Sequence, residues 1–267
     1  MSAIHPTAMV SDEATLGADV EVGPYCVIDG PVELGDGCSL KSHVIVAGRT
    51  RIGPRTTIFP FASIGHQPQD LKFKGEPSRL EIGSDNLIRE HVTMNPGTEG
   101  GGMVTSVGSH CAFLAGSHVG HDCQVGDQVV LSNNVMLAGH CLVESHVIFG
   151  GGSALQQFSR VGKHAFVGGM SGVENDVIPF GLVIGNRAHM LGLNLVGLKR
   201  RGFTRSQIAA LKEAYELIFF GEGALRDRVA KVAGAYGDNE DVMAIVDFMR
   251  DPKSRGVVGP KAADEAA

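Results

Sequence analysis

An apolar residue recurs every six positions along most of the chain between residues 10 and 173. The register is interrupted by an eighteen-residue interval before Ile82 and by a one-residue phase shift before Val107. A second residue, usually small or branched, follows four positions after most of the recurring ones. Side chains of one straight strand alternate strictly between two faces, so inward positions spaced four and two residues apart require a bend each time. The recurring residues are Val10, Leu16, Val22, Ile28, Leu34, Leu40, Val46, Ile52, Ile58, Ile64, Ile82, Ile88, Met94, Val107, Phe113, Val119, Val125, Leu131, Leu137, Val143, Phe149, Leu155, Val161, Val167 and Val173.

The residues between the inward positions are rich in turn formers, such as Gly23-Pro24 and Gly126-Asp127. Each hexapeptide is therefore predicted to be a short strand followed by a corner. Three of them complete an eighteen-residue coil, and each coil covers the apolar interior of the next, as a solenoid requires. The sequence thus predicts an all-β parallel β-helix of about eight coils, and the period leaves the hand of the winding open.

Two segments break the register and are predicted to loop outward, at residues 67–79 (QPQDLKFKGEPSR) and 98–104. Beyond Val173 the apolar period changes to that of helices. Thr204 and Gln207 form a predicted capping box, and further helices are expected over residues 224–235 and 239–249. We expect a β-helix domain at residues 1–186, an α-helical C-terminal domain at residues 187–267, and a frayed tail from Pro252 onward.

Composition and charge narrow the possible partners. The formal net charge is -6 with both signs interspersed, which makes nucleic acid a poor default partner. The N-terminal segment lacks the pattern of a signal peptide and no apolar stretch is long enough to span a bilayer, so we expect a soluble, cytoplasmic protein without a transmembrane segment. The cysteines all occupy the second inward position, which predicts small core residues: Cys26, Cys38, Cys111, Cys123 and Cys141.

His121 is the best candidate for a general base. It follows Val119 by two positions, at a corner facing outward, and an imidazole titrates near neutral pH. Asp122 could reach back at that corner to orient the ring, while the pattern alone equally fits a solvated corner histidine. Counting in eighteens places Gly139 and Gln157 in the same column as His121, with neighbours roughly 4.8 Å apart.

Other polar residues have simpler explanations in the pattern. Three histidines occupy the slot three after a core residue and are interpreted as surface ladder positions: His110, His146 and His164. The basic cluster Lys199, Arg200 and Arg201 precedes Gly202, as at the C-terminus of a helix, where cations are favourable in any case.

Specific motifs accompany the hexapeptides over nearly the whole chain. They are QPQDLK in the first loop, HVGHDC at residues 118–123, LAGH at 137–140 and NLVGLKRRGF at 194–203. In these motifs the chain resembles the UDP-N-acetylglucosamine acyltransferases of lipid A biosynthesis. The resemblance implies a left-handed β-helix and a homotrimer with sites between subunits. It also implies transfer of an (R)-3-hydroxyacyl group to the 3-hydroxyl of the UDP-sugar. The donor is the phosphopantetheine thioester of acyl carrier protein, so no separate cofactor is expected.

The resemblance also implies roles for individual residues. His121 would be the base, Asp122 its orienting partner, and the Gly139 backbone N–H the donor to the oxyanion. Gly169 and Met170 would limit acyl-chain length. The expected substrate contacts are Gln69, Asp70, Lys72, His118, His140, Gln157, Asn194, Arg200 and Arg201. Of these, Arg200 and Arg201 would meet the diphosphate or the phosphopantetheine arm, and together with Lys199 they would meet an acidic carrier protein.

Two departures from the family pattern concern the acceptor. Asn95 stands where well-known members carry a histidine, and Val196 where they carry a glutamate. Some relatives acylate a 3-amino UDP-sugar, so N-acylation is an alternative. A different class, a hexapeptide-fold zinc hydratase, would use His118, His121 and His140 as ligands. A coenzyme-A-dependent acetyltransferase and a purely structural solenoid are weaker alternatives.

Overall fold

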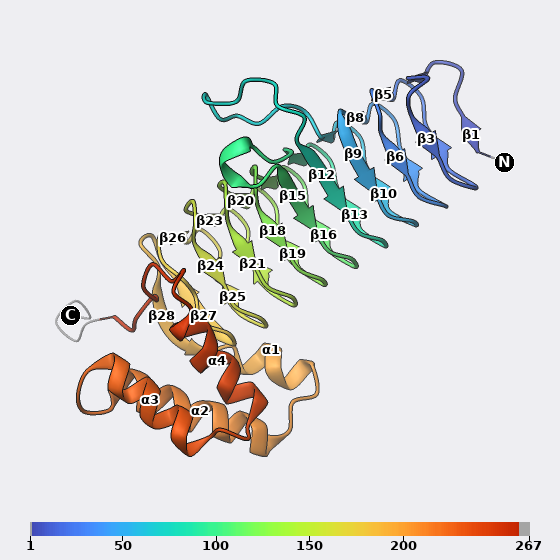
Figure 1. The fold of residues 1–267 in the computed structure, drawn as a ribbon. Coiled ribbons are helices and arrows are strands. Elements are labelled where there is room, and N and C mark those ends of the chain that lie inside the picture. Colours follow the sequence, from blue (N-terminus) through green and yellow to red (C-terminus); the bar gives the residue numbers. More distant parts are fainter. Residues whose placement is uncertain (1, 262–267) are drawn as a thin grey trace.

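The computed structural model describes residues 2–261, and within them short parallel strands form the three faces of a prism (Figure 1). Sheet A consists, in spatial order, of β1 (Ala3–Ile4), β4 (Glu21–Val22), β7 (Ser39–Leu40), β10 (Thr57–Ile58), β13 (Leu87–Ile88), β16 (Ala112–Phe113), β19 (Val130–Leu131), β22 (Ile148–Phe149), β25 (Phe166–Val167), β27 (Gly181–Ile184) and β28 (His189–Leu193). Sheet B consists of β2 (Met9–Val10), β5 (Val27–Asp29), β8 (Ile45–Ala47), β11 (Ser63–Ile64), β14 (Thr93–Met94), β17 (His118–Val119), β20 (Met136–Leu137), β23 (Ala154–Leu155) and β26 (Gly172–Val173). Sheet C consists of β3 (Thr15–Leu16), β6 (Glu33–Leu34), β9 (Arg49–Ile52), β12 (Arg79–Ile82), β15 (Val104–Val107), β18 (Gln124–Val125), β21 (Leu142–Val143) and β24 (Arg160–Val161).

The predicted register is confirmed. Within the strands every recurring apolar position pairs with the next one in its sheet, for example Val119 with Leu137 and Leu137 with Leu155. All of these positions are buried except Val10 and Leu16 at the N-terminal end, which are half-buried. The cysteines are buried free thiols, as predicted. The architecture is the parallel β-helix with a helical C-terminal part that the periodicity predicts, and its hand is the left hand that the family resemblance implies.

The chain passes from sheet A to B, from B to C and from C back to A, which defines an A/B, a B/C and a C/A edge. Corners on these edges use single residues in the left-handed region, among them Asp122 (φ 60) and His140 (φ 61) on the B/C edge. Short polar or aromatic side chains at these corners stack above one another in successive coils. The edges therefore fix columns of side chains eighteen residues apart.

Both predicted loops leave the prism from the B/C edge. The first runs from β11 to β12, and the second runs from β14 to β15 and contains the short 3-10 helix η1 (Glu99–Gly101). Figure 1 shows the two excursions, in teal and green, on the same side of the prism. The sheets stay in register across both insertions, since β9 pairs with β12 and β12 with β15. The scaffold thus concentrates its irregular segments on one edge.

The C-terminal part contains α1 (Leu195–Arg200), α2 (Arg205–Phe220), α3 (Leu225–Ala235) and α4 (Glu240–Arg250). The predicted capping box at the start of α2 is confirmed, because Thr204 and Gln207 each bond the other's backbone N–H. The proposed domain boundary at residue 186 falls inside the antiparallel hairpin β27–β28, which prolongs sheet A to Leu193. The division into two domains remains a proposal.

The prediction of a frayed tail from Pro252 is wrong for the residues up to Pro260. Val257 and Pro260 form bridges to Asp176 and Met190, and Val258 is buried. The physical reason is a buried ion pair that the sequence pattern does not reveal. Arg160 bonds Asp176 at 2.8 Å and Asp251 at 2.7 Å, so it ties the end of α4 to the last coils.

Candidate active site

The residues that could take part in catalysis lie together on the B/C edge. His121 and Asp122 form the corner between β17 and β18, and His140 forms the corner between β20 and β21, one coil further along. The backbone N–H of His140 donates to the carbonyl of His121 at 2.9 Å, and the N–H of Phe158 donates to Gly139 at 3.2 Å. These bonds confirm the predicted stacking of His121, Gly139 and Gln157 in one column.

His121 and Asp122 form a hydrogen-bonded pair. His121 Nδ1 lies 2.8 Å from Asp122 Oδ2, so the Nδ1–H donates to the carboxylate and Nε2 keeps a lone pair. Asp122 also accepts from the Thr98 backbone N–H at 2.8 Å and from the Thr98 hydroxyl at 2.6 Å. The carboxylate is thus held from two sides, which fixes the tautomer and orientation of the imidazole.

The structure contradicts the alternative interpretation of His121 as a solvated corner histidine. The residue is only 8 % exposed and Asp122 only 5 %. The second loop buries Asp122, because Thr98 caps the carboxylate and Gly101 lies against it so closely that a Cβ there would overlap the Asp122 oxygens. The second loop is therefore a cover for this carboxylate.

Gly139 lies directly against the candidate base. A Cβ at this position would come within 2.5 Å of His121 Cε1 and Nε2, so only glycine leaves the ring in place. Gly139 is buried, and its backbone N–H has no acceptor among residues 2–261. A buried amide without a partner is rare in folded proteins, and it is a ready donor for an oxyanion.

Two further histidines adjoin the pair. The His140 ring packs edge-on against His121 at 4.9 Å, stacks on Phe158 at 4.4 Å, and lies 3.8 Å from Asp122 Oδ2. His118 lies on β17, where its Nδ1 is 2.7 Å from the Thr93 hydroxyl. Burial lowers the pKa of both His118 and His140, which keeps these rings neutral near pH 7.

The first loop approaches this edge. Asn95 holds its start by donating to the carbonyls of His66 at 3.0 Å and Gln67 at 3.3 Å, while Asn95 Oδ1 is buried without a partner among residues 2–261. The charges of Asp70 and Lys72 are close enough to influence the pKa of His140, after its burial and Asp122. Gln69, Leu71 and Lys72 are exposed at the tip of the loop, and Asp70 accepts from the Lys72 N–H at 3.0 Å.

The remaining predicted site residues lie on other edges of the same chain. Asn194 caps α1, accepting from the Gly197 N–H and donating to the carbonyl of His164. Arg201 donates to the carbonyl of His146, which places it at the C/A edge, and its Nη1 is buried without a partner among residues 2–261. Arg200 and Val196 are exposed on α1.

Gly169 and Met170 form an exposed corner on the A/B edge, between β25 and β26. Within one chain they therefore do not share an edge with His121. Gly139 and His140 belong to the B/C edge, whereas Gly169, Met170, Asn194 and Arg201 belong to the two others.

His146 and His164 form the predicted ladder, because their rings stack at 4.5 Å. Their interpretation as surface positions is wrong, since Phe203 packs edge-on against His164 at 5.3 Å and Arg201 donates to the carbonyl of His146. Burial, followed by the charges of His146, Arg201 and Lys163, lowers the pKa of His164 to about 4. Only His110 of the three is an exposed corner.

The residues that could hold a metal ion differ from the set His118, His121 and His140. Within the described chain, the ligand atoms that lie within 4.8 Å of one another belong to His121, Asp122 and His140. The carboxylate of Asp122 is already occupied by hydrogen bonds from Thr98 and His121. The arrangement therefore fits a base and its orienting carboxylate better than a zinc centre with three imidazoles.

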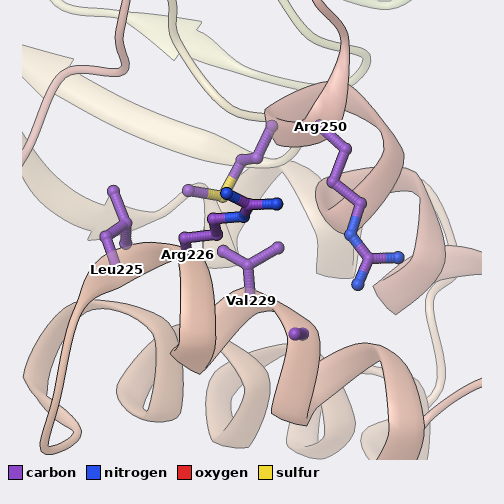
Figure 2. A pocket seen from close by; sticks show the side chains of 6 residues that line it. Leu225, Arg226, Val229 and Arg250 are labelled. Atoms are coloured by element: carbon purple, nitrogen blue, oxygen red, sulfur yellow. The ribbon is translucent and has the colours of Figure 1, made fainter.

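Two hollows show where a ligand could enter. One of about 620 Å³ adjoins the pair and is lined by Asp122, Gln124, His140, Cys141, Leu142, Phe158, Arg160, Lys253 and Arg255. A larger one of about 790 Å³ lies between α3 and α4, where Figure 2 shows the side chains of Leu225, Arg226, Val229 and Arg250. The larger hollow carries no candidate base or nucleophile, so the chemistry favours the smaller one.

Comparison with family models indicates the broad class of protein. Residues 4–48 match the family model for bacterial transferase hexapeptides (six repeats), and residues 176–258 match that for domain 2 of UDP-N-acetylglucosamine O-acyltransferase. In these two segments, the N-terminal coils and the C-terminal part, the chain is thus similar to the hexapeptide-repeat acyltransferases.

Full-length relatives identify the particular family. Acyl-[acyl-carrier-protein]–UDP-N-acetylglucosamine O-acyltransferases from Rhizobium johnstonii and Sinorhizobium fredii are 48 % and 49 % identical over 96 % of this chain, and the matches cover 94 % and 95 % of those proteins. The solved structure of LpxA from Acinetobacter baumannii is 39 % identical with a TM-score of 0.89, over 96 % of this chain and 99 % of that one. The chain belongs to the acyl-[acyl-carrier-protein]–UDP-N-acetylglucosamine O-acyltransferase family.

Sequence reasoning missed two residues of the site. Thr98, which holds Asp122, and Phe158, which stacks on His140, lie outside the sequence motifs. Phe158 could have been found by counting eighteen from His140, since the two share a column. Thr98 could not, because the loop that carries it lies outside the register.

None of the helices within residues 2–261 is long and apolar enough to cross a membrane.

Proposed function

We propose that this protein transfers an (R)-3-hydroxyacyl group from acyl carrier protein to the 3-hydroxyl of UDP-N-acetylglucosamine, the first step of lipid A biosynthesis, in the cytoplasm. The observation that carries the mechanism is the buried His121–Asp122 pair beside the free N–H of Gly139. The family supports the substrates, because its relatives are named for this donor and this acceptor.

In the proposed reaction His121 Nε2 removes the proton from the acceptor hydroxyl as its oxygen attacks the thioester carbonyl carbon. Asp122 stabilises the imidazolium that forms. The tetrahedral oxyanion accepts a hydrogen bond from the Gly139 N–H. The intermediate then collapses, the C–S bond breaks, and the imidazolium returns its proton to the departing pantetheine thiolate. The products are the 3-O-acyl sugar nucleotide and free carrier protein, with His121 neutral again.

The distribution of the predicted site residues supports a homotrimer. His121, Asp122 and Gly139 lie on the B/C edge, whereas Arg201 lies on the C/A edge of the same chain. A prism cannot bring two of its edges together, but a threefold arrangement sets one edge of each copy against another edge of its neighbour. We therefore propose that each site combines the B/C edge of one copy with the helical cap of the next.

The remaining roles follow from this arrangement. The first loop, with Gln69, Asp70 and Lys72, and the residues His118, His140 and Gln157 would contact substrate from the B/C edge. Asn194, Arg200 and Arg201 would contact the nucleotide from the neighbouring copy, and Gly169 with Met170 would limit the acyl chain. The exposed side chain of Leu71 at the loop tip suits burial against that neighbour.

Replacing the candidate base tests the proposal. His121→Ala is expected to lower kcat at least a hundredfold, because general-base catalysis contributes on that scale. The assay uses an (R)-3-hydroxyacyl thioester of acyl carrier protein with UDP-N-acetylglucosamine or its 3-amino analogue. His110→Ala, at an exposed corner, is the matched control. An active His121→Ala enzyme with an unchanged fold would remove His121 as base.

The acceptor alternative is decided by the same assay. The relatives are named O-acyltransferases, and so the 3-amino sugar is not favoured. We expect faster transfer to the hydroxyl acceptor. Equal rates would end the idea that Asn95 and Val196 take part in acceptor selection. The zinc hydratase is likewise not favoured by the family.

A further inference from the structure

Two cationic side chains border the active-site cavity without a role in the mechanism above. Lys253 and Arg255, from the tail after α4, line the same cavity as Asp122 and His140. Both are exposed, and the salt bridges among residues 2–261 leave them without a carboxylate partner. Unpaired cations beside a cavity are the usual way in which proteins attract an anionic ligand.

The tail is held rigidly where it carries these cations. Arg160 and Asp176 are buried, and between them they bind Asp251 and the hydroxyl of Ser254. Further along, Asp176 bonds the backbone of Gly256 and of Val258. Lys253 and Arg255 alternate with these anchored positions. Their backbone is therefore fixed at the B/C edge, beside the candidate catalytic pair.

Arg255 is connected to that pair through stacked rings. Its Nη1 donates to the carbonyl of Gln157 at 3.2 Å, and its guanidinium lies 5.6 Å from the centre of the Phe158 ring. Phe158 in turn stacks on His140 at 4.4 Å. One hydrogen bond to a neutral carbonyl leaves most of the guanidinium N–H donors available to a ligand.

We propose that Lys253 and Arg255 form an anion site for the diphosphate of the nucleotide sugar. This inference rests on the proposed function, which supplies two phosphate-bearing substrates. The diphosphate is attached to the sugar ring that carries the reacting hydroxyl, so it must lie close to His121. The phosphodiester of phosphopantetheine lies at the far end of an extended arm from the thioester. A cavity that borders directly on Asp122 and His140 therefore fits the diphosphate.

The double variant Lys253→Gln/Arg255→Gln tests the site. Its KM for UDP-N-acetylglucosamine is expected to rise roughly tenfold, the effect of one lost charge-assisted contact, with kcat and the KM for the acyl carrier protein thioester nearly unchanged. Calorimetric titration with UDP alone should show the same loss of affinity. Lys41→Gln/Arg49→Gln removes two equivalent exposed charges from the N-terminal coils and should behave like wild type.

The outcomes separate this inference from the proposed function. An unchanged affinity for UDP in the double variant would overturn the diphosphate site, while acyl transfer by the wild type would still support the function. A raised KM for the carrier protein thioester alone would assign the cations to the donor and also overturn it. If the wild type transfers no acyl group, the proposed function is wrong. The titration with UDP still measures whether Lys253 and Arg255 bind the diphosphate. Thermal unfolding of both double variants checks that the fold is retained.

Discussion

The carboxylate of Asp122 accepts hydrogen bonds from two different segments, so it joins the second loop to the corner that carries His121. Thr98 supplies two donors from the second loop, and His121 supplies the third. In Asp122→Asn an amide N–H must face at least one of these donors. We expect kcat to fall at least a hundredfold, because the imidazole loses its fixed tautomer, and stability to fall by about 1–3 kcal/mol.

Kinetics and chemical denaturation of Asp122→Asn measure the two effects. Thr98→Val is the informative control, because it removes the hydroxyl contact and keeps the carboxylate. Its kcat should fall much less. Full activity in Asp122→Asn would mean that His121 does not depend on the carboxylate for its orientation.

Gly139 offers a second test at the scale of one residue. In Gly139→Ala the added methyl group would overlap the His121 ring, while the backbone at this position needs no left-handed conformation. We expect a loss of kcat of about tenfold to a hundredfold, with a small change in melting temperature. Gly237→Ala is the matched control, since its Cβ would meet only a carbonyl oxygen at an ordinary 3.5 Å. An unaffected kcat would show that the ring can move without cost.

The sequence predicts this column of residues better than its surroundings. Strict eighteen-residue spacing places Gly139 against His121 before any coordinates are known, because the coils stack in register. The cover over Asp122 could not be predicted, since it depends on Thr98 and Gly101 in an irregular loop. Periodicity determines which residues share an edge and says nothing of what an insertion covers.

At the scale of elements, α1 and the residues after it dock onto two stacked histidines. His164 lies between His146 and Phe180, under Phe203, with Nδ1 buried and without a partner among residues 2–261. Arg201 and Lys163 face the ring, and together with burial and His146 they lower its pKa to about 4. A proton on this ring would have no compensating anion there.

The docking should therefore weaken in acid. The unfolded His164 takes up its proton near pH 6.5 and the folded one only near pH 4, so in this window the unfolded state binds more protons. The contribution of neutral His164 to stability is therefore complete above pH 6.5. It declines as the pH falls below 6.5 and is lost as the pH falls through 4. His164→Phe, which preserves the stack, should abolish up to about 2 kcal/mol of this dependence, after allowance for solvent screening.

Denaturant titrations of His164→Phe and wild type at pH 7.5 and pH 4.5 measure this difference. His110→Phe controls for the loss of an exposed corner histidine. Equal pH dependence in all three proteins would contradict the assignment to His164.

The helices themselves are predictable from capping and apolar spacing, as α2 illustrates. Their docking is not, because neither the histidine stack nor the Arg160–Asp176 pair is local in sequence.

At the scale of the whole molecule, a single prism holds the pieces of the site on separate edges. The sequence motifs place His121 and Arg201 in one site, whereas the structure places them on the B/C and C/A edges of one chain. Both statements hold if the edges belong to neighbouring copies. No periodicity within one chain predicts such an arrangement, because it depends on the packing of surfaces between copies.

Mixed assemblies test this sharing directly. His121→Ala and Arg201→Ala damage different edges, so each homo-oligomer should be nearly inactive. When equal amounts are unfolded and refolded together, a site is intact if the B/C edge comes from the Arg201→Ala chain and the neighbouring cap from the His121→Ala chain. Random assembly into trimers makes about a quarter of the sites intact, and we expect activity to recover to about that fraction of wild type. Mixing His121→Ala with Asp122→Asn, which damage the same edge, should give no recovery. Sedimentation establishes the oligomer in each mixture. If the mixture of different edges stays inactive while trimers form, the two edges do not combine across copies, and Arg201 lies outside the site of His121.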